Sequence, residues 1–176
     1  IMEHWAIEPD VLRSYARHFE TDEVIPEELI ARLRAASKFN TGFATTEYLA
    51  ACFLDMAWHG ENATDIEDVP AFEEAIAHQI GNTTVVDPRY KSSYFQHIFS
   101  DDHYSAGYYV YIWAEVLDAD AFELFLENGI FDSATAKAFE THVLSKGGTE
   151  HPMTLYKRFR GKEPDPSALL RRSGLV

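Results

Sequence analysis

Apolar residues recur at intervals of three and four along most of the chain, and this spacing is typical of one face of an α-helix. Two such stripes of apolar residues follow a proline that suits the first turn of a helix, and they predict helices at 9–20 and 26–36. The first stripe ends at Phe19. Residues 43–59 are apolar on nearly every side, so we expect that helix at the centre of the domain. Further helices are predicted, in chain order, at 70–80, 90–99, 107–127, 133–145, 152–160 and 166–173.

Two segments have the composition of a β-strand. Residues 83–86 read Thr-Thr-Val-Val, but no second strand of comparable quality can pair with them, so we interpret 82–88 as an extended loop. Residues 108–113 are strand-like by composition, yet they continue into an Ala-Glu-Val-Leu run that favours a helix. The sequence therefore predicts an all-α fold without a substantial sheet, as a single domain over residues 1–176. The positions expected on the core face of the 107–127 helix are Tyr109, Ile112, Trp113, Val116 and Leu117.

Composition narrows the class of protein. A chain of 176 residues with 46% hydrophobic and 14% aromatic residues can bury a sizeable core. Its formal net charge of −14, from 29 acidic and 15 basic side chains, repels nucleic acids and anionic membrane surfaces, so neither is expected as a partner. The single cysteine, Cys52, lies in an apolar run and excludes an internal disulfide. No apolar run is long enough to cross a bilayer and no signal peptide opens the chain, so we expect a cytoplasmic protein.

The residues most able to do chemistry gather in the segment 97–113. It begins with a histidine and a polar turn, and then places Tyr104, Tyr108 and Tyr111 ahead of a long apolar stretch. If the backbone is helical from Gly107 onward, the spacing of these tyrosines aligns their hydroxyls on one face. Phenols and imidazoles are neutral donors that could stabilise a developing oxyanion. The alternative is an aromatic helix face that packs against a neighbouring element.

A catalytic group that could start a reaction is harder to find. None of the eight histidines is followed by glutamate, so the H-E-x-x-H motif of zinc peptidases is absent. His97 and His103 lie six residues apart and could share a metal ion, but no carboxylate or thiol stands at a fixed spacing beside them, and a hydrogen-bonding role suits each better. Cys52 has no adjacent base, and no G-x-S-x-G elbow occurs. We therefore predict no metal ligand in this chain.

Six motifs, in order, resemble the C-terminal portion of the thimet-oligopeptidase-like zinc peptidases, in particular the bacterial peptidyl-dipeptidases, also called dipeptidyl carboxypeptidases. They span nearly the whole chain: E-H-W-A at 3–6, Y-A-R-H at 15–18, L-D-M-A-W-H at 54–59, P-R-Y-K-S-S-Y-F-Q-H-I-F at 88–99, G-Y-Y-V-Y-I-W at 107–113 and Y-K-R-F-R-G-K at 156–162. This resemblance implies an all-helical lobe of a two-lobed hydrolase that encloses short peptides in a deep channel. The parent enzyme would release dipeptides from the C-terminus of its substrates.

In that family, zinc is held by the two histidines of H-E-x-x-H and a downstream glutamate, and it activates water with the motif glutamate as general base. The resemblance implies that all four residues lie upstream of Ile1, the third ligand only slightly so, on the helix that ends at residues 3–5. We therefore expect a C-terminal fragment of a zinc metallopeptidase. The fragment itself should bind no catalytic zinc and hydrolyse no peptide.

The resemblance also implies roles for individual residues. Tyr111 matches the tyrosine that donates to the tetrahedral oxyanion, and Tyr104 matches a second tyrosine on a mobile loop that closes on the substrate. His97 matches the histidine at the root of that loop. Tyr108 matches a further tyrosine that contacts the substrate. These four positions are the predicted catalytic and substrate-binding residues, with His103 added as a substrate-binding residue within the loop.

The loop departs from the family pattern. Relatives carry glycines between the histidine and the first tyrosine, whereas this chain has Ser100, Asp101, Asp102 and His103 there. Because glycine adopts backbone angles that other residues reach only at a cost, the loop is expected to be stiffer. The two carboxylates could repel the terminal carboxylate of a substrate, or they could simply be solvated loop charges, which we favour.

Two kinds of partner are expected beside short peptide substrates. The first is the N-terminal part of the same enzyme, and the second is another copy of the fragment, bound through an apolar face that the missing part leaves exposed. An alternative function is a free-standing helical interaction or ligand-binding module that kept the scaffold and lost the chemistry. An upstream reading frame that encodes H-E-x-x-H would decide against that alternative.

Overall fold

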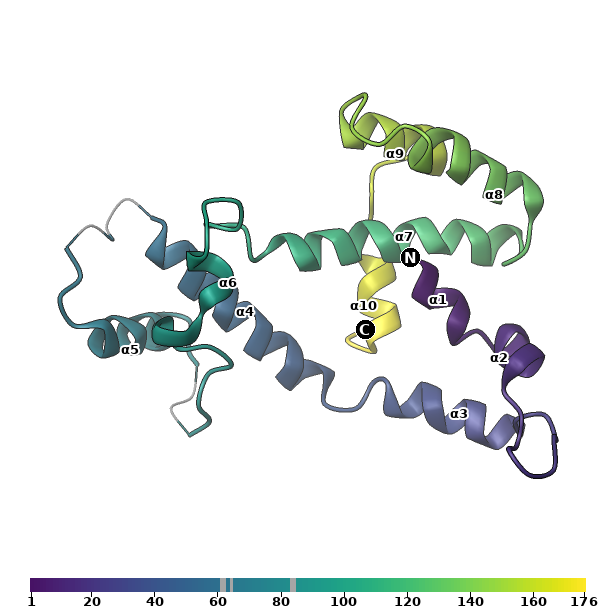
Figure 1. Ribbon diagram of the computed structural model, residues 1–176, viewed down its shortest axis with the longest axis horizontal. Coiled ribbons are helices and arrows are strands. Elements are labelled where there is room, and N and C mark those ends of the chain that lie inside the picture. Colours follow the sequence, from purple (N-terminus) through teal and green to yellow (C-terminus); the bar gives the residue numbers. More distant parts are fainter. Residues whose placement is uncertain (61–62, 64, 83–84) are drawn as a thin grey trace. The chain divides into compact units, whose positions relative to one another are not determined.

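The computed structural model describes residues 1–60, 63, 65–82 and 85–176, and this part of the chain is all-α (Figure 1). Within those residues the only strand-like pairing is an isolated antiparallel bridge between Arg17 and Val24. The predicted all-α fold is confirmed. The α-helices are α1 (Met2–Ala6), α2 (Pro9–Tyr15), α3 (Glu27–Ala36), α4 (Thr41–Trp58), α5 (Val69–Gln79), α6 (Gln96–Phe99), α7 (Val110–Asn128), α8 (Ser133–Phe139), α9 (Pro152–Arg160) and α10 (Ser167–Ser173), with a 3-10 turn η1 (Ser92–Tyr94) and a π turn η2 (Glu140–Leu144).

The chain divides into two compact units. The first unit combines residues 1–39 with residues 114–176, and the second unit is residues 40–113. A single domain over the whole chain therefore stays a prediction. Across the described residues, no helix combines the length and the apolar character that crossing a membrane requires.

Aromatic rings form the core of the first unit. Phe122 and Phe125 of α7 are buried, and the Trp5 ring of α1 stands edge-on against both, with ring centroids 4.6 and 4.7 Å away. The Trp5 indole N–H donates to the carbonyl oxygen of Ile130 at 2.7 Å. The start of the chain is thus fixed to the far end of α7. The same cluster includes two aromatic side chains from α9, Tyr156 and Phe159.

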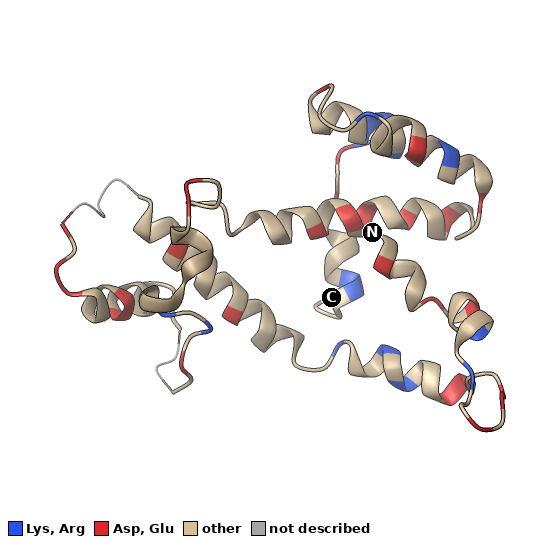
Figure 2. Ribbon diagram, viewed as in Figure 1, with Lys and Arg blue, Asp and Glu red and all other residues tan. Residues whose placement is uncertain are grey.

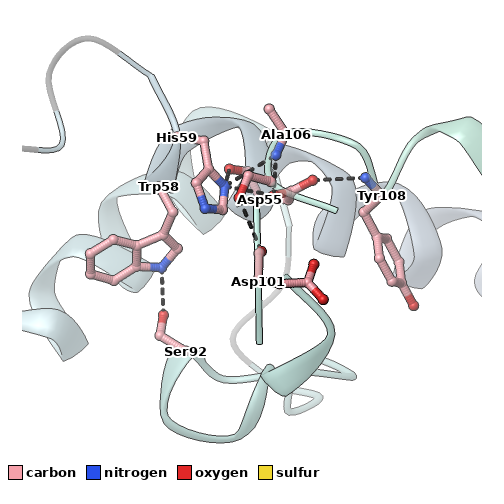
Figure 3. Close-up of polar contacts among 8 residues, drawn as sticks. Asp55, Trp58, His59, Ser92, Asp101, Ala106 and Tyr108 are labelled. Atoms are coloured by element: carbon pink, nitrogen blue, oxygen red, sulfur yellow. Dashed lines mark hydrogen bonds and ion pairs between the residues drawn. The ribbon is translucent and has the colours of Figure 1, made fainter. Parts of the chain in front are cut away.

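The core of the second unit joins α4 to residues 90–108. Phe95 is fully buried there, and the Tyr90 ring stacks on it with centroids 4.3 Å apart. Trp58, at the end of α4, donates its indole N–H to the Ser92 hydroxyl at 2.7 Å (Figure 3). These contacts hold the segment that carries the predicted site against α4.

The helix predicted at 9–20 is shorter than expected, because α2 ends at Tyr15. The chain then turns back on itself. The Nδ1 atom of His18 accepts the backbone N–H groups two and three residues further on, at 3.3 and 3.2 Å. Side-chain acceptors of this kind compete with the hydrogen bonds of a helix. Phe19, which the apolar stripe included, is 89% exposed.

The helix predicted at 43–59 forms as α4 and is apolar as expected, but it is not buried on every side, as a helix at the centre of the domain would be. One face is buried, whereas Phe43, Phe53 and Met56 are about half-exposed. Periodicity shows which residues are apolar and leaves open what covers them.

The helix predicted at 107–127 forms as α7, which begins three residues later than expected. Tyr109 and Trp113, which we placed on its core face, are about half-exposed. The helix begins late because a buried side chain, Asp55, holds the preceding residues in a turn, as described below. The helices predicted at 152–160 and 166–173 are found as α9 and α10 within one residue.

Three further segments complete the comparison. The predicted helix 90–99 splits at the fully buried Phe95, whose backbone leaves the helical region, into η1 and α6. Segment 133–145 is α-helical in its first half and continues as the π turn. In the predicted extended loop 82–88, residues 83–84 lie outside the described part of the chain.

Candidate functional site

Four of the five residues predicted from the sequence come together around one imidazole, in the second unit. His97 on α6 lies with its Nε2 atom 2.9 Å from the Tyr111 hydroxyl oxygen, in the first turn of α7. The His97 ring centroid is 4.6 Å from that of Tyr104 and 5.4 Å from that of Tyr108. We call these four side chains the His97 cluster. Their roles in catalysis stay a prediction.

The arrangement of the cluster differs from a row along one helix. Because α7 begins at Val110, only Tyr111 is on the helix, and Tyr104 and Tyr108 belong to the turn before it. The expectation of three hydroxyls on one helical face is therefore wrong. The side chains meet because the turn folds back toward His97.

Two of the tyrosines are open to a ligand. Tyr104 and Tyr111 are each 42% exposed, whereas His97 is half-buried. Either the Tyr111 hydroxyl donates to Nε2 or the imidazole N–H donates to the hydroxyl oxygen, depending on the tautomer. In the second case the phenolic proton remains available for a ligand. The contact can therefore orient a neutral donor at an accessible place.

Tyr108 has a different environment, because it is only 6% exposed. Burial, followed by a hydrogen bond with Tyr90, raises the pKa of its phenol to about 12. Its ring stands edge-on against Phe95 at 5.1 Å and stacks on Tyr48 at 5.5 Å. Tyr108 is therefore part of the packed core of the unit, and its contact with substrate stays a prediction.

His103 lies outside the cluster. It is exposed in the turn that follows α6, and its backbone N–H donates to the Asp101 carboxylate at 2.9 Å. In the described part of the chain, no contact joins its ring to the His97 cluster. The Asp101 and Asp102 side chains are exposed, as expected of solvated loop charges.

The sequence reasoning missed a buried acid beside the site. Asp55 on α4 is fully buried, and its carboxylate accepts the backbone N–H groups of Ala106, at 3.0 Å, and Tyr108, at 2.8 Å (Figure 3). The Nδ1 atom of His59, which caps the C-terminal end of α4, lies 2.8 Å from the same carboxylate. A buried carboxylate needs such partners. The signal was present in the sequence as an aspartate and a histidine four residues apart in the otherwise apolar stretch 48–59.

Tyr48, one more residue that the sequence reasoning missed, bridges the two ends of the same turn. Its hydroxyl donates to the Tyr108 carbonyl oxygen at 2.6 Å and accepts the Ile112 N–H at 3.3 Å. Burial, and then a hydrogen bond with Cys52, raises the pKa of the Tyr48 phenol. The hydroxyl therefore stays protonated and able to donate.

The unit that holds the cluster is acidic (Figure 2). Arg89 and Lys91 are the basic residues of segment 40–113. The Arg89 guanidinium lies 5.5 Å from the centre of the Tyr90 ring, and the Lys91 ammonium lies 3.1 Å from the Asp87 carboxylate. This unit therefore presents the tyrosine and histidine side chains of the cluster rather than unpaired cations.

Other kinds of catalytic group have little support. Among the residues that the structure describes, no group of three or more His, Cys, Asp or Glu side chains could hold a metal ion. Cys52 is buried, and burial raises the pKa of its thiol, so little of it is the reactive thiolate near neutral pH. Among the described residues, the His97 cluster thus offers hydrogen-bond donors, and Cys52 is not set up as a nucleophile.

Half-exposed neutral donors on an all-helical scaffold fit a lobe that contributes to a hydrolytic active site. The profile of Peptidase family M3 matches residues 1–175, and the chain belongs to this family. The resemblance stated from the sequence motifs is therefore confirmed.

The chain is similar to two bacterial dipeptidyl carboxypeptidases and to an oligopeptidase A. It is 40% identical over 177 residues to the dipeptidyl carboxypeptidase of Escherichia coli, and 41% identical over 177 residues to that of Salmonella typhimurium. It is 38% identical over 179 residues to oligopeptidase A of Haemophilus influenzae. Each alignment covers 99% of this chain and 26% of the relative. The chain thus spans about a quarter of the length of the curated relatives it matches.

Proposed function

We propose that this chain is the C-terminal part of the catalytic lobe of a zinc-dependent peptidyl-dipeptidase or oligopeptidase that hydrolyses short peptides. In this proposal Tyr111, Tyr104 and His97 are catalytic residues, and Tyr108 and His103 help to bind the substrate. The observation that carries the proposal is the contact of 2.9 Å between the Tyr111 hydroxyl and His97 Nε2, at a place that is open to a ligand. Family membership supplies the reaction class.

Peptide hydrolysis passes through a tetrahedral intermediate with a negatively charged oxygen. A donor that is already oriented toward that oxygen lowers the barrier, because no reorganisation is needed as the charge develops. His97 limits the directions that the Tyr111 hydroxyl can take, and Tyr104 adds a second phenol beside the same imidazole. Both phenols are neutral, so their burial under a bound peptide costs less than the burial of a cation.

The residues of this chain do not fit the zinc site that the family resemblance implies, since the described residues contain no suitable cluster of ligands. We propose that the ligands lie upstream in the longer enzyme. The isolated chain should then bind no zinc at catalytic stoichiometry and cleave no peptide. Metal analysis of the purified chain, together with a quenched fluorescent peptide assay, tests this expectation. Zinc-dependent turnover by the isolated chain would refute it.

The oxyanion role is tested by Tyr111→Phe in the full-length peptidase. The substitution removes one donor and keeps the ring, so kcat should fall by about a hundredfold or more while KM changes little. Tyr94→Phe is a matched control, because Tyr94 is also a half-exposed tyrosine of the second unit and lies outside the cluster. Unchanged turnover in Tyr111→Phe would remove the assigned role.

The proposed protein partners are the N-terminal part of the same enzyme and, for the isolated chain, a second copy. Both proposals are supported by the apolar side chains that α4 exposes. Phe53 and Met56 of α4, with Phe72 and Ile76 of α5, line an open hollow of about 580 Å³ in the second unit. Sedimentation of the isolated chain over a range of concentrations tests the second copy, and a strictly monomeric chain would contradict it.

A further inference from the structure

We propose that Tyr48 and Asp55, supported by His59, are positioning residues that fix the backbone of residues 106–112 and so set where Tyr111 presents its hydroxyl. The proposal rests on the function proposed above and extends it to residues outside the His97 cluster. Tyr48 and Asp55 form hydrogen bonds with the backbone of residues 106–112, and His59 contacts Asp55.

The positioning residues share one face of α4. Positions 48, 52, 55 and 59 are separated by four, three and four residues, which is the spacing of one helical face. The polar groups on this face all contact the segment 106–112 or one another. The position of residues 106–112 is therefore fixed relative to one helix, α4.

Asp55 fixes the start of the segment with two separate hydrogen bonds. The Ala106 N–H donates to Oδ1 and the Tyr108 N–H donates to Oδ2, so each carboxylate oxygen holds one residue. His59 Nδ1 lies 2.8 Å from Oδ1 and 3.2 Å from the Ala106 backbone nitrogen, and its role as donor or acceptor depends on the tautomer. His59 therefore contacts both the carboxylate and the residue that the carboxylate holds.

The backbone held by Asp55 is one that the chain would not adopt on its own. Ala106 has a φ of +53°, in the left-handed region that costs free energy for a residue with a Cβ atom. At Gly107 an added Cβ would lie 3.3 Å from the Tyr104 carbonyl oxygen, so the turn is also tight. A left-handed alanine persists where surrounding contacts enforce it, and the Asp55 hydrogen bonds are such contacts.

Tyr48 fixes the segment on both sides of Tyr111. Its hydroxyl binds the carbonyl oxygen of Tyr108, three residues before Tyr111, and the N–H of Ile112, the residue after it. Rotation of the first turn of α7 would break one of these two hydrogen bonds. Because the backbone on both sides of Tyr111 is held in this way, the direction of its side chain is limited independently of the His97 contact.

The neighbouring residues 100–105 lack this support. In the described chain, the hydrogen bonds of residues 100–105 run to α6, within the loop or to the Gly107 N–H, as in the bond from the Ser100 hydroxyl to the Gln96 carbonyl oxygen. The contrast predicts a boundary at Ala106 in the hydrogen exchange of the backbone amides. The amides of residues 100–105 should exchange freely, and those of residues 106–112 should be protected.

Hydrogen–deuterium exchange of the full-length peptidase tests the positioning without relying on activity. Peptides that cover 106–112 should exchange slowly, and Asp55→Asn should speed their exchange by about tenfold or more, because an asparagine side chain has only one oxygen for the two N–H groups. Peptides from α9 should not change. Equally fast exchange at 106–112 with and without Asp55 would overturn the proposal, even if Tyr111 proves catalytic.

Kinetics then connects the positioning to Tyr111. Asp55→Asn should lower kcat on the order of a hundredfold with little change in KM, since small displacements of an oriented group have effects of this size. In Tyr111→Phe there is no hydroxyl left to orient, so adding Asp55→Asn should lower kcat by only about threefold more. Losses that multiply would show that Asp55 acts independently of Tyr111, and the proposal would fail.

Two further variants separate positioning from general destabilisation. Asp120→Asn changes another buried aspartate, in the first unit, and should leave kcat of the folded enzyme within about twofold of the unchanged protein. If Asp55→Asn does not fold, Tyr48→Phe removes only a hydroxyl and should give the same pattern of faster exchange and lower kcat. Normal exchange and normal kcat in Tyr48→Phe would overturn the proposal. If Tyr111→Phe alone has normal turnover, the proposed function fails, and the exchange data still decide the positioning.

Discussion

Tyr156→Phe should destabilise the first unit by about 2 kcal/mol. The Tyr156 hydroxyl donates to the Asp120 carboxylate at 2.5 Å, and both side chains are buried. Burial, and then this hydrogen bond, raises the pKa of the phenol, so it stays a donor over the normal pH range. A hydrogen bond to a charged acceptor contributes about 1.5–3 kcal/mol. We expect the lower half of this range because Lys162 Nζ, at 3.3 Å, and Arg160 Nε, at 3.5 Å, still face the carboxylate after the substitution.

Asp120→Ala should cost more, roughly 3 kcal/mol or above, because it removes the carboxylate from the Tyr156 hydroxyl and from the Arg160 and Lys162 cations at once. The Tyr156 hydroxyl would be left buried without its partner, and the largely buried Arg160 would keep only Glu127, at 2.8 Å. In the double variant the hydroxyl is gone as well. Its destabilisation should therefore be smaller than the sum of the two single effects by about 1 kcal/mol or more.

The measurement is urea unfolding in a background where Trp5 is the only tryptophan, made by Trp58→Phe and Trp113→Phe. Trp5 packs in the same aromatic cluster as Tyr156, so its fluorescence reports on the first unit. The midpoint and the slope together give the free energy of unfolding. A loss below about 0.5 kcal/mol in Tyr156→Phe, or strictly additive effects in the double variant, would refute the reasoning.

Two other predictions concern single side chains. The Cys52 thiol, which is buried and has a raised pKa, should stay unreactive toward iodoacetamide at about pH 8 in the native chain and react after unfolding in urea, so rapid native labelling would contradict its burial. Asp132 caps α8 by accepting the Thr135 N–H at 2.7 Å, and this bond lowers the pKa of its carboxyl. Its stabilisation is present above the unfolded pKa and is lost as the pH falls through the folded pKa. Asp132→Asn keeps the cap without titrating, so its thermal midpoint should fall less than that of the unchanged protein between about pH 5 and 3, and parallel losses would disprove this role.

Helices with local end signals were predicted within one residue. In α9, Pro152 occupies the first turn, and Gly161 closes the helix with a φ of +80°. In α10, Gly174 closes the helix in the same left-handed conformation. Proline and glycine act within a few residues of where they stand, so these ends can be identified without knowledge of the tertiary structure.

Helix ends that depend on distant partners were not predicted. The start of α7 is set by Asp55, about fifty residues earlier in the chain, which holds the turn before the helix. The split at Phe95 follows from the burial of one ring in the core of the second unit. Neither partner can be identified from local periodicity. The exposure of Phe53 and Met56 was missed for a related reason, since periodicity identifies apolar residues and not their neighbours.

The two interpretations of the tyrosine segment are separated by the partners of each hydroxyl. Tyr108 and Tyr111 have the same chemistry and lie three residues apart, so spacing alone assigns them the same role. In the structure, the Tyr108 ring is buried and its phenol is bound within the core by Tyr90, whereas the Tyr111 phenol is partly exposed and meets His97. Packing therefore describes Tyr108, and donation to a ligand fits Tyr111. The backbone of Tyr108, held by Asp55 and Tyr48, connects the two roles, because the buried residue fixes the turn from which the exposed donor projects.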